Sequence, residues 1–414
     1  MFKPPALEAP MIRRRTLTTL GLAAATLLAA CGGGGDDAPA PAAVTPPPAP
    51  MLANQLYTQT NETTNTVLQY SRAANGTLLR VAAVASGGQG TNGIRINGTP
   101  GPNTLGSQFS VVTVPERQLL LAANGGDNSI SVFALDAASG TPTLLKNTRT
   151  QGLRPNSLAV AGKVVYASFL GGTLQLGAYR LADDGSLQQL GLYNVAQMGA
   201  LNPANVAPTQ LLVSPDQRFV MLSTGTASNA VLAFPVNADG TLGNPVANTT
   251  QLTTPFAGQF VKTGNGSTIY LSTGITGVSL TAYTLASTGV LTQLSQAMAA
   301  GVGAPCWLSV TPNGRYAYVG NGSGSISSYG IGNDGTLTLL QSIAAMEPSV
   351  LAGVNSVAGD AWVSPDGKYL YSTYLGADKI VSYAIDASTG ALSKVGEVIV
   401  GTSSKLGLQG MAGV

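Results

Sequence analysis

Short runs in which apolar and polar residues alternate, separated by turn residues, recur along most of the chain. The clearest example covers residues 360–398, where four such runs are separated by turns that include Pro365-Asp366-Gly367 and Gly376-Ala377-Asp378. Alternation with a period of two, as in Lys379–Ile385, is typical of a half-buried strand rather than a helix. Pro, Asp and Gly set the backbone angles of tight turns. The pattern predicts a four-stranded antiparallel meander.

The same unit recurs along the chain, and a turn of the Asp-Gly-Thr-Leu type precedes its outermost strand. The glycines of these turns are spaced by 64, 45, 55, 49, 46 and 55 residues. A repeat of about 40–50 residues with four strands is typical of a β-propeller blade. We therefore predict an all-β fold, a seven-bladed β-propeller of four-stranded antiparallel blades. The seven glycines are Gly76, Gly140, Gly185, Gly240, Gly289, Gly335 and Gly390.

The two ends of the repeated region complement each other. Six units have a first strand before the second one, but the first unit begins almost directly with the second-strand run at Gln55–Gln59. The last residues, 406–414, have the character of a first strand. We expect this C-terminal strand to join the first blade and close the ring, which would satisfy backbone groups otherwise left on an open edge.

The N-terminal part of the chain has a different composition and predicts an export signal. Arg13-Arg14-Arg15 precedes an apolar run of 14 residues, 17–30, which is shorter than the roughly 20 residues that span a bilayer. The run ends in Leu28-Ala29-Ala30-Cys31, which resembles the lipobox of bacterial lipoproteins. We interpret residues 1–30 as a lipoprotein signal peptide and Cys31 as the lipidated residue. An ordinary signal peptide followed by a chance cysteine is the alternative.

Residues 31–51 are rich in Gly, Ala and Pro and are expected to form a flexible tether, with the propeller in residues 52–414. The chain would then be an exported bacterial lipoprotein of the cell envelope, on the periplasmic side or at the outer membrane. Only its lipid anchor would contact the membrane. Arg14-Arg15 also fits a twin-arginine signal, and Met11 is an alternative start, so both export routes and both starts stay open.

Charge and residue content exclude several classes of function. Removing four basic residues and one acidic residue with the signal peptide leaves 16 basic and 17 acidic groups, so no basic excess indicates nucleic acid as a partner. The chain contains no histidine, which excludes imidazole-based triads and His-containing zinc sites. We predict a monomer without cofactor or metal. Cys306 is interpreted as a buried apolar residue rather than a nucleophile.

Two consecutive blade patterns resemble a known family. VTPNGRYAYVGNGSGSISSYGIGNDGTL (310–337) and VSPDGKYLYSTYLGADKIVSYAIDASTGAL (363–392) are similar to the seven-bladed β-propeller lactonase family, and the resemblance extends over roughly residues 52–414. Its best-known members hydrolyse 6-phosphogluconolactone. In that family the strand before the last Ser-Pro-Asp-Gly turn carries an acid and a histidine, and an arginine follows the next strand. The acid position corresponds here to Asp360, the histidine position to Trp362 and the arginine position to Leu375.

Several polar and aromatic residues are predicted to surround one mouth of the central channel. Asp360 and its equivalents in other blades, five residues before a tight turn, lie where the innermost strands begin. We predict Asp360 as the catalytic residue, activating water. An alternative is that the amides only satisfy backbone groups between blades and the indoles fill the core. The predicted substrate-binding residues are Gln210, Gln259, Trp307, Trp362, Arg154 and Gln409.

The resemblance and this set of residues together predict hydrolysis of a sugar-type lactone. A location outside the cytosol argues against phosphorylated 6-phosphogluconolactone itself as the substrate. The alternative prediction is a non-catalytic envelope propeller that binds a glycan, a small polar or sugar-like molecule, or an envelope protein.

Overall fold

The computed structural model describes residues 52–198, 207–249, 254–277 and 279–414. The predicted signal peptide (1–30), Cys31 and the predicted tether (31–51) lie outside the described residues. The described residues all belong to one compact unit. No helix among the described residues is long and apolar enough to cross a membrane.

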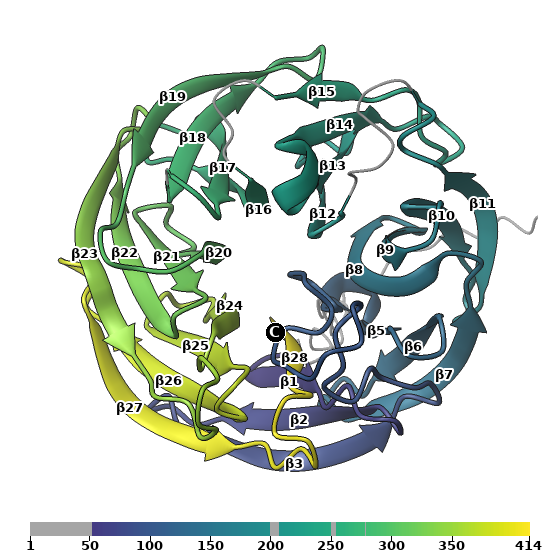
Figure 1. The fold of residues 1–414 in the computed structure, drawn as a ribbon, viewed down its shortest axis with the longest axis horizontal. Helices are drawn as coiled ribbons and strands as arrows, with labels where there is room; N and C mark the ends of the chain where they lie inside the picture. The colour runs from purple at the N-terminus through teal and green to yellow at the C-terminus, as the bar shows by residue number, and fades with distance from the viewer. Residues whose placement is uncertain (1–51, 199–206, 250–253, 278) are drawn as a thin grey trace, which may run out of the picture. The chain divides into compact units, whose positions relative to one another are not determined.

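Seven four-stranded antiparallel sheets surround a central axis, which confirms the predicted seven-bladed propeller (Figure 1). Each blade runs from an innermost to an outermost strand. The first three blades are β28 (Gln409–Gly413), β1 (Gln55–Gln59), β2 (Thr66–Arg72), β3 (Leu78–Ala85); β4 (Val111–Val114), β5 (Leu119–Asn124), β6 (Ser129–Leu135), β7 (Pro142–Arg149); and β8 (Leu153–Ala161), β9 (Val164–Gly171), β10 (Leu176–Leu181), β11 (Leu187–Tyr193).

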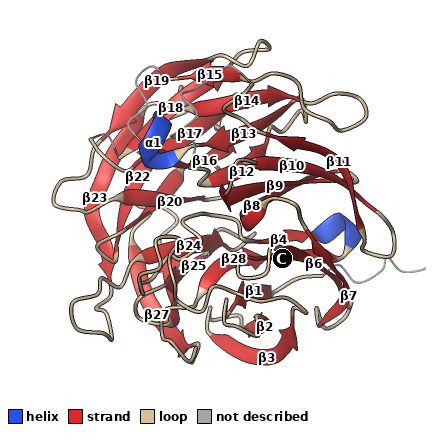
Figure 2. Cartoon of the chain, turned by 45° about the vertical axis from the view of Figure 1, so that its right-hand side comes forward, coloured by secondary structure: helices blue, strands red, loops and turns tan. Residues whose placement is uncertain are grey.

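The other four blades follow the same order. They are β12 (Gln210–Val213), β13 (Phe219–Ser223), β14 (Val231–Pro235), β15 (Val246–Asn248); β16 (Pro255–Lys262), β17 (Thr268–Gly274), β18 (Leu280–Leu285), β19 (Leu291–Ala297); β20 (Pro305–Val310), β21 (Tyr316–Asn321), β22 (Ser325–Ile331), β23 (Leu337–Met346); and β24 (Ala358–Val363), β25 (Tyr369–Tyr374), β26 (Lys379–Ile385), β27 (Leu392–Ile399). The helices of the described residues are the short η1 (Pro115–Arg117) and α1 (Gly225–Ser228) (Figure 2).

Strand burial explains the hydrophobic pattern of the sequence. Every residue of β5 and β20 is buried, because these strands have blades on both faces. The outermost strands β3 and β27 have no buried residue, and partly buried and exposed positions alternate along much of each. Alternating exposure is therefore found on the outermost strands. The run Lys379–Ile385, predicted to be half-buried, is β26, a third strand, and six of its seven residues are buried.

The repeated turn has a physical reason that is the same in every blade. The seven marker glycines all have positive φ angles, between 69° and 88°, which glycine adopts without the steric cost of a Cβ atom. In the fourth blade, the carboxylate of Asp239 accepts hydrogen bonds from both the backbone N–H and the hydroxyl of Thr241. The Asp-Gly-Thr order therefore supplies the turn with its backbone geometry and its hydrogen-bond acceptor.

The C-terminal strand closes the ring as predicted. β28 pairs with β1 in antiparallel register, with Leu56 opposite Gly413 and Tyr57 opposite Ala412. The N–H of Val414 also donates to the carbonyl of Gln55. The first blade thus combines both ends of the propeller, and unfolding of one end removes the partner of the other.

Buried tyrosines tie neighbouring blades together. The hydroxyl of Tyr57 in the first blade donates to the carbonyl of Gly140, the marker glycine of the second, at 2.7 Å. Tyr166 makes the same contact with Gly240 at 3.1 Å. Burial raises the pKa of Tyr166 to about 12, so the phenol stays a donor at physiological pH.

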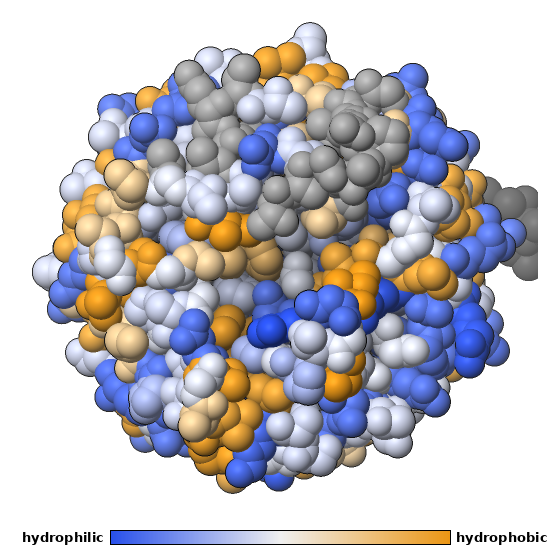
Figure 3. Space-filling view, in the orientation of Figure 1, coloured by the Kyte–Doolittle hydropathy of each residue, from blue (hydrophilic) through white to orange (hydrophobic). Residues whose placement is uncertain are grey.

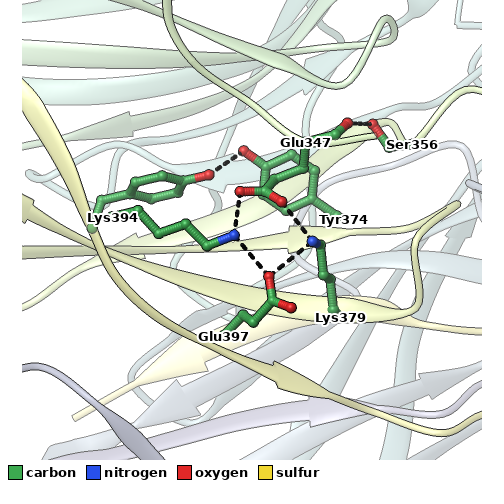
Figure 4. Close-up of polar contacts among 7 residues, drawn as sticks. Glu347, Ser356, Tyr374, Lys379, Lys394 and Glu397 are labelled. Carbon is green, nitrogen blue, oxygen red and sulfur yellow. Dashed lines mark hydrogen bonds and ion pairs between the residues drawn. The ribbon is translucent and has the colours of Figure 1, made fainter. Parts of the chain in front are cut away.

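A cluster of four charged residues joins the last two blades (Figure 4). The Lys379 ammonium on β26 lies 2.5 Å from the Glu347 carboxylate, which follows β23, and 2.9 Å from Glu397 on β27. Lys394 completes the ring, 2.7 Å from each of the two carboxylates. The side chains of Lys379 and Glu347 are 9% and 8% exposed. Each buried charge therefore depends on its partners.

Candidate functional site

The loop between β3 and β4, residues 86–110, accounts for the long first spacing of 64 residues between marker glycines. In Figure 1 this loop, in blue, lies over the middle of the ring. We call its last part, residues 104–110, the channel segment. It makes hydrogen bonds with the first, third, fourth, sixth and seventh blades. The central channel is therefore crossed by the protein's own backbone.

Gln108 anchors the channel segment on opposite sides of the ring. Its amide group pairs with the backbone of Leu308 on β20: Nε2 donates to the carbonyl at 2.8 Å, and Oε1 accepts from the N–H at 3.0 Å. On the other side, the Ser157 hydroxyl on β8 donates to the Gln108 carbonyl at 2.7 Å, and the Gln108 N–H donates to the carbonyl of Thr209. Gln108 is 1% exposed.

Two cavities lie near the channel segment. The upper cavity, of about 480 Å³, lies where the inner strands begin, and its lining includes Arg95, Asn103, Trp307 and Asn355. The lower cavity, of about 540 Å³, lies where the inner strands end, and Gln108 and Phe109 contribute to its lining. On the face of the propeller shown in Figure 3, hydrophilic and hydrophobic residues border a hollow at the centre of the ring.

Asp360 lies on the innermost strand of the last blade, β24, beside the channel segment. Its Oδ1 accepts a hydrogen bond from the N–H of Phe109 at 3.0 Å, and the carboxylate is 2% exposed. Burial raises the pKa of Asp360 to about 7, although hydrogen bonds from the Phe109 and Gly410 amides act in the opposite direction. A carboxylate that titrates near neutral pH can exchange protons with a substrate at that pH.

The raised pKa predicts a pH-dependent effect of Asp360→Asn on stability. Since the folded state holds a proton on Asp360 up to about pH 7 and the unfolded state loses it near pH 4, the wild-type carboxylate lowers stability progressively as the pH rises between these values. Asn has no charge to bury and keeps the acceptor for Phe109. We expect the melting temperature of the variant, relative to wild type, to be higher at pH 8 than at pH 4. A difference that is constant with pH would contradict the raised pKa.

Three of the predicted substrate-binding residues make contacts within the chain. Gln210 pairs with Gly258 of the next blade, donating from Nε2 to its carbonyl at 3.0 Å and accepting from its N–H. Trp307 is 2% exposed, and its indole N–H donates to the Ser107 carbonyl at 3.0 Å. The Arg154 guanidinium donates to the carbonyls of Ile94 and Thr104. Arg154 and Trp307 therefore hold the loop that crosses the channel.

The other predicted residues are divided between different places. Gln259 and Trp362 are partly exposed and line the lower cavity. The pairing of β24 with β25 shifts register between Ala358 and Ala361, so Asp360 lies at a β-bulge. Asp360 is buried, whereas Trp362 is partly exposed. Gln409 is buried; its Nε2 donates to the Leu408 carbonyl, and its Oε1 has no hydrogen-bond partner in the described part of the chain.

Cys306 lies beside Trp307 and is buried, and this burial strongly raises the pKa of its thiol. A thiol without an adjacent base in an apolar setting is a poor nucleophile. The structure thus supports the interpretation of Cys306 as a small apolar core residue.

Gln108 is not among the predicted site residues, although the sequence contains a signal for its loop. The first interval between marker glycines, 64 residues, exceeds all the others, and an insertion that long is often functional. This loop joins the outermost strand of the first blade, β3, to the innermost strand of the second, β4, and so leads to the channel. Nothing in the residues themselves showed that it would enter the channel.

Comparison with known proteins gives the class of this propeller. The family described as "Lactonase, 7-bladed beta-propeller" matches residues 53–170 and 244–404. This is more than half of the chain, and the chain belongs to that family.

Individual relatives agree with this assignment. A 6-phosphogluconolactonase of Yersinia pestis is 27% identical over 286 residues, covering 68% of this chain and 80% of that protein. One from Serratia proteamaculans is 24% identical over 286 residues, with 68% and 81% covered.

Solved structures share the fold at lower sequence identity. A protein from Lactobacillus plantarum has a TM-score of 0.65 at 18% identity, with 86% of this chain and 98% of that chain covered. A periplasmic gluconolactonase of Pseudomonas aeruginosa has a TM-score of 0.62 at 17% identity, with 84% and 97% covered.

Proposed function

We propose that this protein hydrolyses a sugar-type lactone, with Asp360 as the general base. The observation that carries the proposal is a buried carboxylate with its pKa raised to about 7, at the family's acid position in a lactonase-family propeller. The 6-phosphogluconolactonase relatives supply the reaction class by analogy. As an exported protein, it would act on an unphosphorylated aldonolactone outside the cytosol.

In this mechanism the Asp360 carboxylate removes a proton from a water molecule as its oxygen attacks the lactone carbonyl carbon. The bond between that carbon and the ring oxygen then breaks, and the ring oxygen takes up a proton to become a hydroxyl. The product is an open hydroxy acid, which releases a proton at neutral pH. Because lactones are reactive esters, one positioned base and a few hydrogen-bond donors suffice for acceleration.

The upper cavity is the substrate site in this proposal. Arg95 and Asn355 provide donors at its wall, and the Asn103 Oδ1 is buried without a partner among the described residues. A volume of about 480 Å³ lies within the usual range for small-molecule sites. Asp360 is 2% exposed and is not in the lining of either cavity. The channel segment, whose Phe109 amide donates to Oδ1 of Asp360, therefore has to move before water and substrate can reach the carboxylate.

The proposal is tested by a pH-stat screen of the purified protein against unphosphorylated aldonolactones and simple γ-lactones. We expect at least one aldonolactone to be hydrolysed, with kcat/KM rising as the pH passes through about 7, because the base must be ionised. No hydrolysis over the panel by a protein with an intact β-sheet circular dichroism spectrum would contradict the proposal.

A second candidate is a non-catalytic module that binds a small polar or sugar-like ligand in the upper cavity. It is favoured by the hydrogen bonds that Asp360, Gln210 and Trp307 make to the protein's own backbone. Such a module would bind a ligand saturably and without turnover, and Trp307→Ala would weaken the binding.

A further inference from the structure

The lower cavity lies outside the proposed lactone site and has a different chemistry. All seven innermost strands contribute to its wall. Its partly exposed apolar side chains come from four of them: Val112 on β4, Val160 on β8, Leu212 and Val213 on β12, and Trp362 on β24. Gln108 and Phe109 of the channel segment also line it. The wall therefore combines these apolar side chains with a few polar groups, among them the partly exposed Gln259.

Most polar groups in this wall are engaged with the backbone. The Thr113 hydroxyl donates to the Gly413 carbonyl, and the Ser309 hydroxyl donates to the Ala361 carbonyl at 2.7 Å. A sugar bound here would lose its hydrogen bonds to water and find few replacements. An apolar ligand has no hydrogen bonds to water to lose. Its binding also buries the partly exposed valine, leucine and indole side chains, which is favourable.

The charge around the lower cavity disfavours an anionic ligand. Glu116 on η1 is the one ionisable residue in the described lining, and it is exposed. The next residue, Arg117, is directed elsewhere: its guanidinium donates to the Gly162 carbonyl and lies 4.0 Å from Asp183. An anionic head group would therefore meet a carboxylate and no cation of the lining.

We propose that the lower cavity is a second ligand site, which binds a neutral small molecule with an aliphatic or aromatic body. A volume of about 540 Å³ suits a molecule with a medium-length alkyl chain or two aromatic rings. Trp362 supplies a flat apolar face, and its indole packs against Gly413, where even an added Cβ atom would collide with the ring.

The proposal is tested by titrating the purified protein with the neutral apolar fluorophore N-phenyl-1-naphthylamine. We expect saturable binding of one molecule per chain. Val213→Arg, which places a charged side chain in the pocket, should weaken binding at least tenfold, and Val160→Arg on a different strand should do the same. Leu79→Arg is the matched control, because Leu79 is 67% exposed on the outer strand β3. Non-saturable binding, or equal binding by the folded pocket variants and wild type, would overturn the proposal.

Displacement of the fluorophore tests the charge preference. Decanol should displace it at a concentration at least tenfold lower than decanoate at pH 8 and low salt, because decanoate carries its charge to the mouth beside Glu116. Glu116→Gln should reduce this difference, whereas the Leu79→Arg control should leave it unchanged. Equal displacement by decanol and decanoate in the wild type would overturn the neutral-ligand assignment.

Discussion

Asp360→Asn is expected to lower kcat of lactone hydrolysis by about 100- to 10,000-fold, the usual contribution of a general base. The substitution is nearly isosteric, and the Asn oxygen can still accept from Phe109, so the channel segment should keep its position. The residual activity should also lose its rise through pH 7, because the titrating group is absent. Both effects are measured by pH-stat kinetics between pH 5 and 9.

A control variant separates this effect from a general loss of acidic residues. Asp334 is an exposed turn acid whose carboxylate accepts from the Thr336 N–H, far from the inner strands in the blade order. Asp334→Asn should leave kcat within twofold of wild type. If Asp360→Asn behaves like Asp334→Asn on an active substrate, Asp360 is not the base.

Glu347→Gln is expected to reduce the free energy of unfolding by about 3 kcal/mol or more, the effect of breaking a buried ion pair from one side. The substitution leaves Glu397 as the one remaining carboxylate for both the buried Lys379 ammonium and Lys394. Lys379 cannot reach bulk water, since its side chain is 9% exposed, whereas Lys394 is 42% exposed and stays partly solvated. Denaturant unfolding followed by circular dichroism measures the change.

The matched control is an exposed ion pair on another blade. Asp183 is 84% exposed and lies 3.1 Å from the Lys163 ammonium, and such pairs contribute about 0–1 kcal/mol. Asp183→Asn should therefore change the unfolding free energy by less than about 1 kcal/mol. A loss in Glu347→Gln no larger than in Asp183→Asn would show that the cluster of Figure 4 adds little to the contact between the last two blades.

The likeness of the blades made the fold predictable. Each blade uses the same local signals, a run such as Lys379–Ile385 and a turn such as Asp239-Gly240-Thr241, whose backbone geometry depends on neighbours in sequence. The closing strand Gln409–Gly413 was predictable for a related reason: the first unit lacked an inner strand and the chain's end supplied one. Because the same strand and turn signals recur in all seven blades, few other topologies fit the sequence.

The candidate site was only partly predictable. Counting back from tight turns placed Asp360, Gln210 and Trp307 near the beginnings of the inner strands, where the structure has them. Their hydrogen-bond partners could not be counted in this way, because Phe109, Gly258 and Ser107 belong to other blades or to the channel segment. Whether a polar side chain faces a ligand or a backbone group depends on such distant partners.

The sequence by itself determined the number of blades, the strand order and the closure of the ring, since each follows from short-range patterns or from their spacing. Only the tertiary structure decided that residues 104–110 cross the channel, that burial brings the pKa of Asp360 to about 7, and that two cavities of different chemistry result. These properties arise where segments hundreds of residues apart, such as Gln108 and Leu308, meet inside the ring. Burial and cross-ring hydrogen bonds have no local signature in the chain.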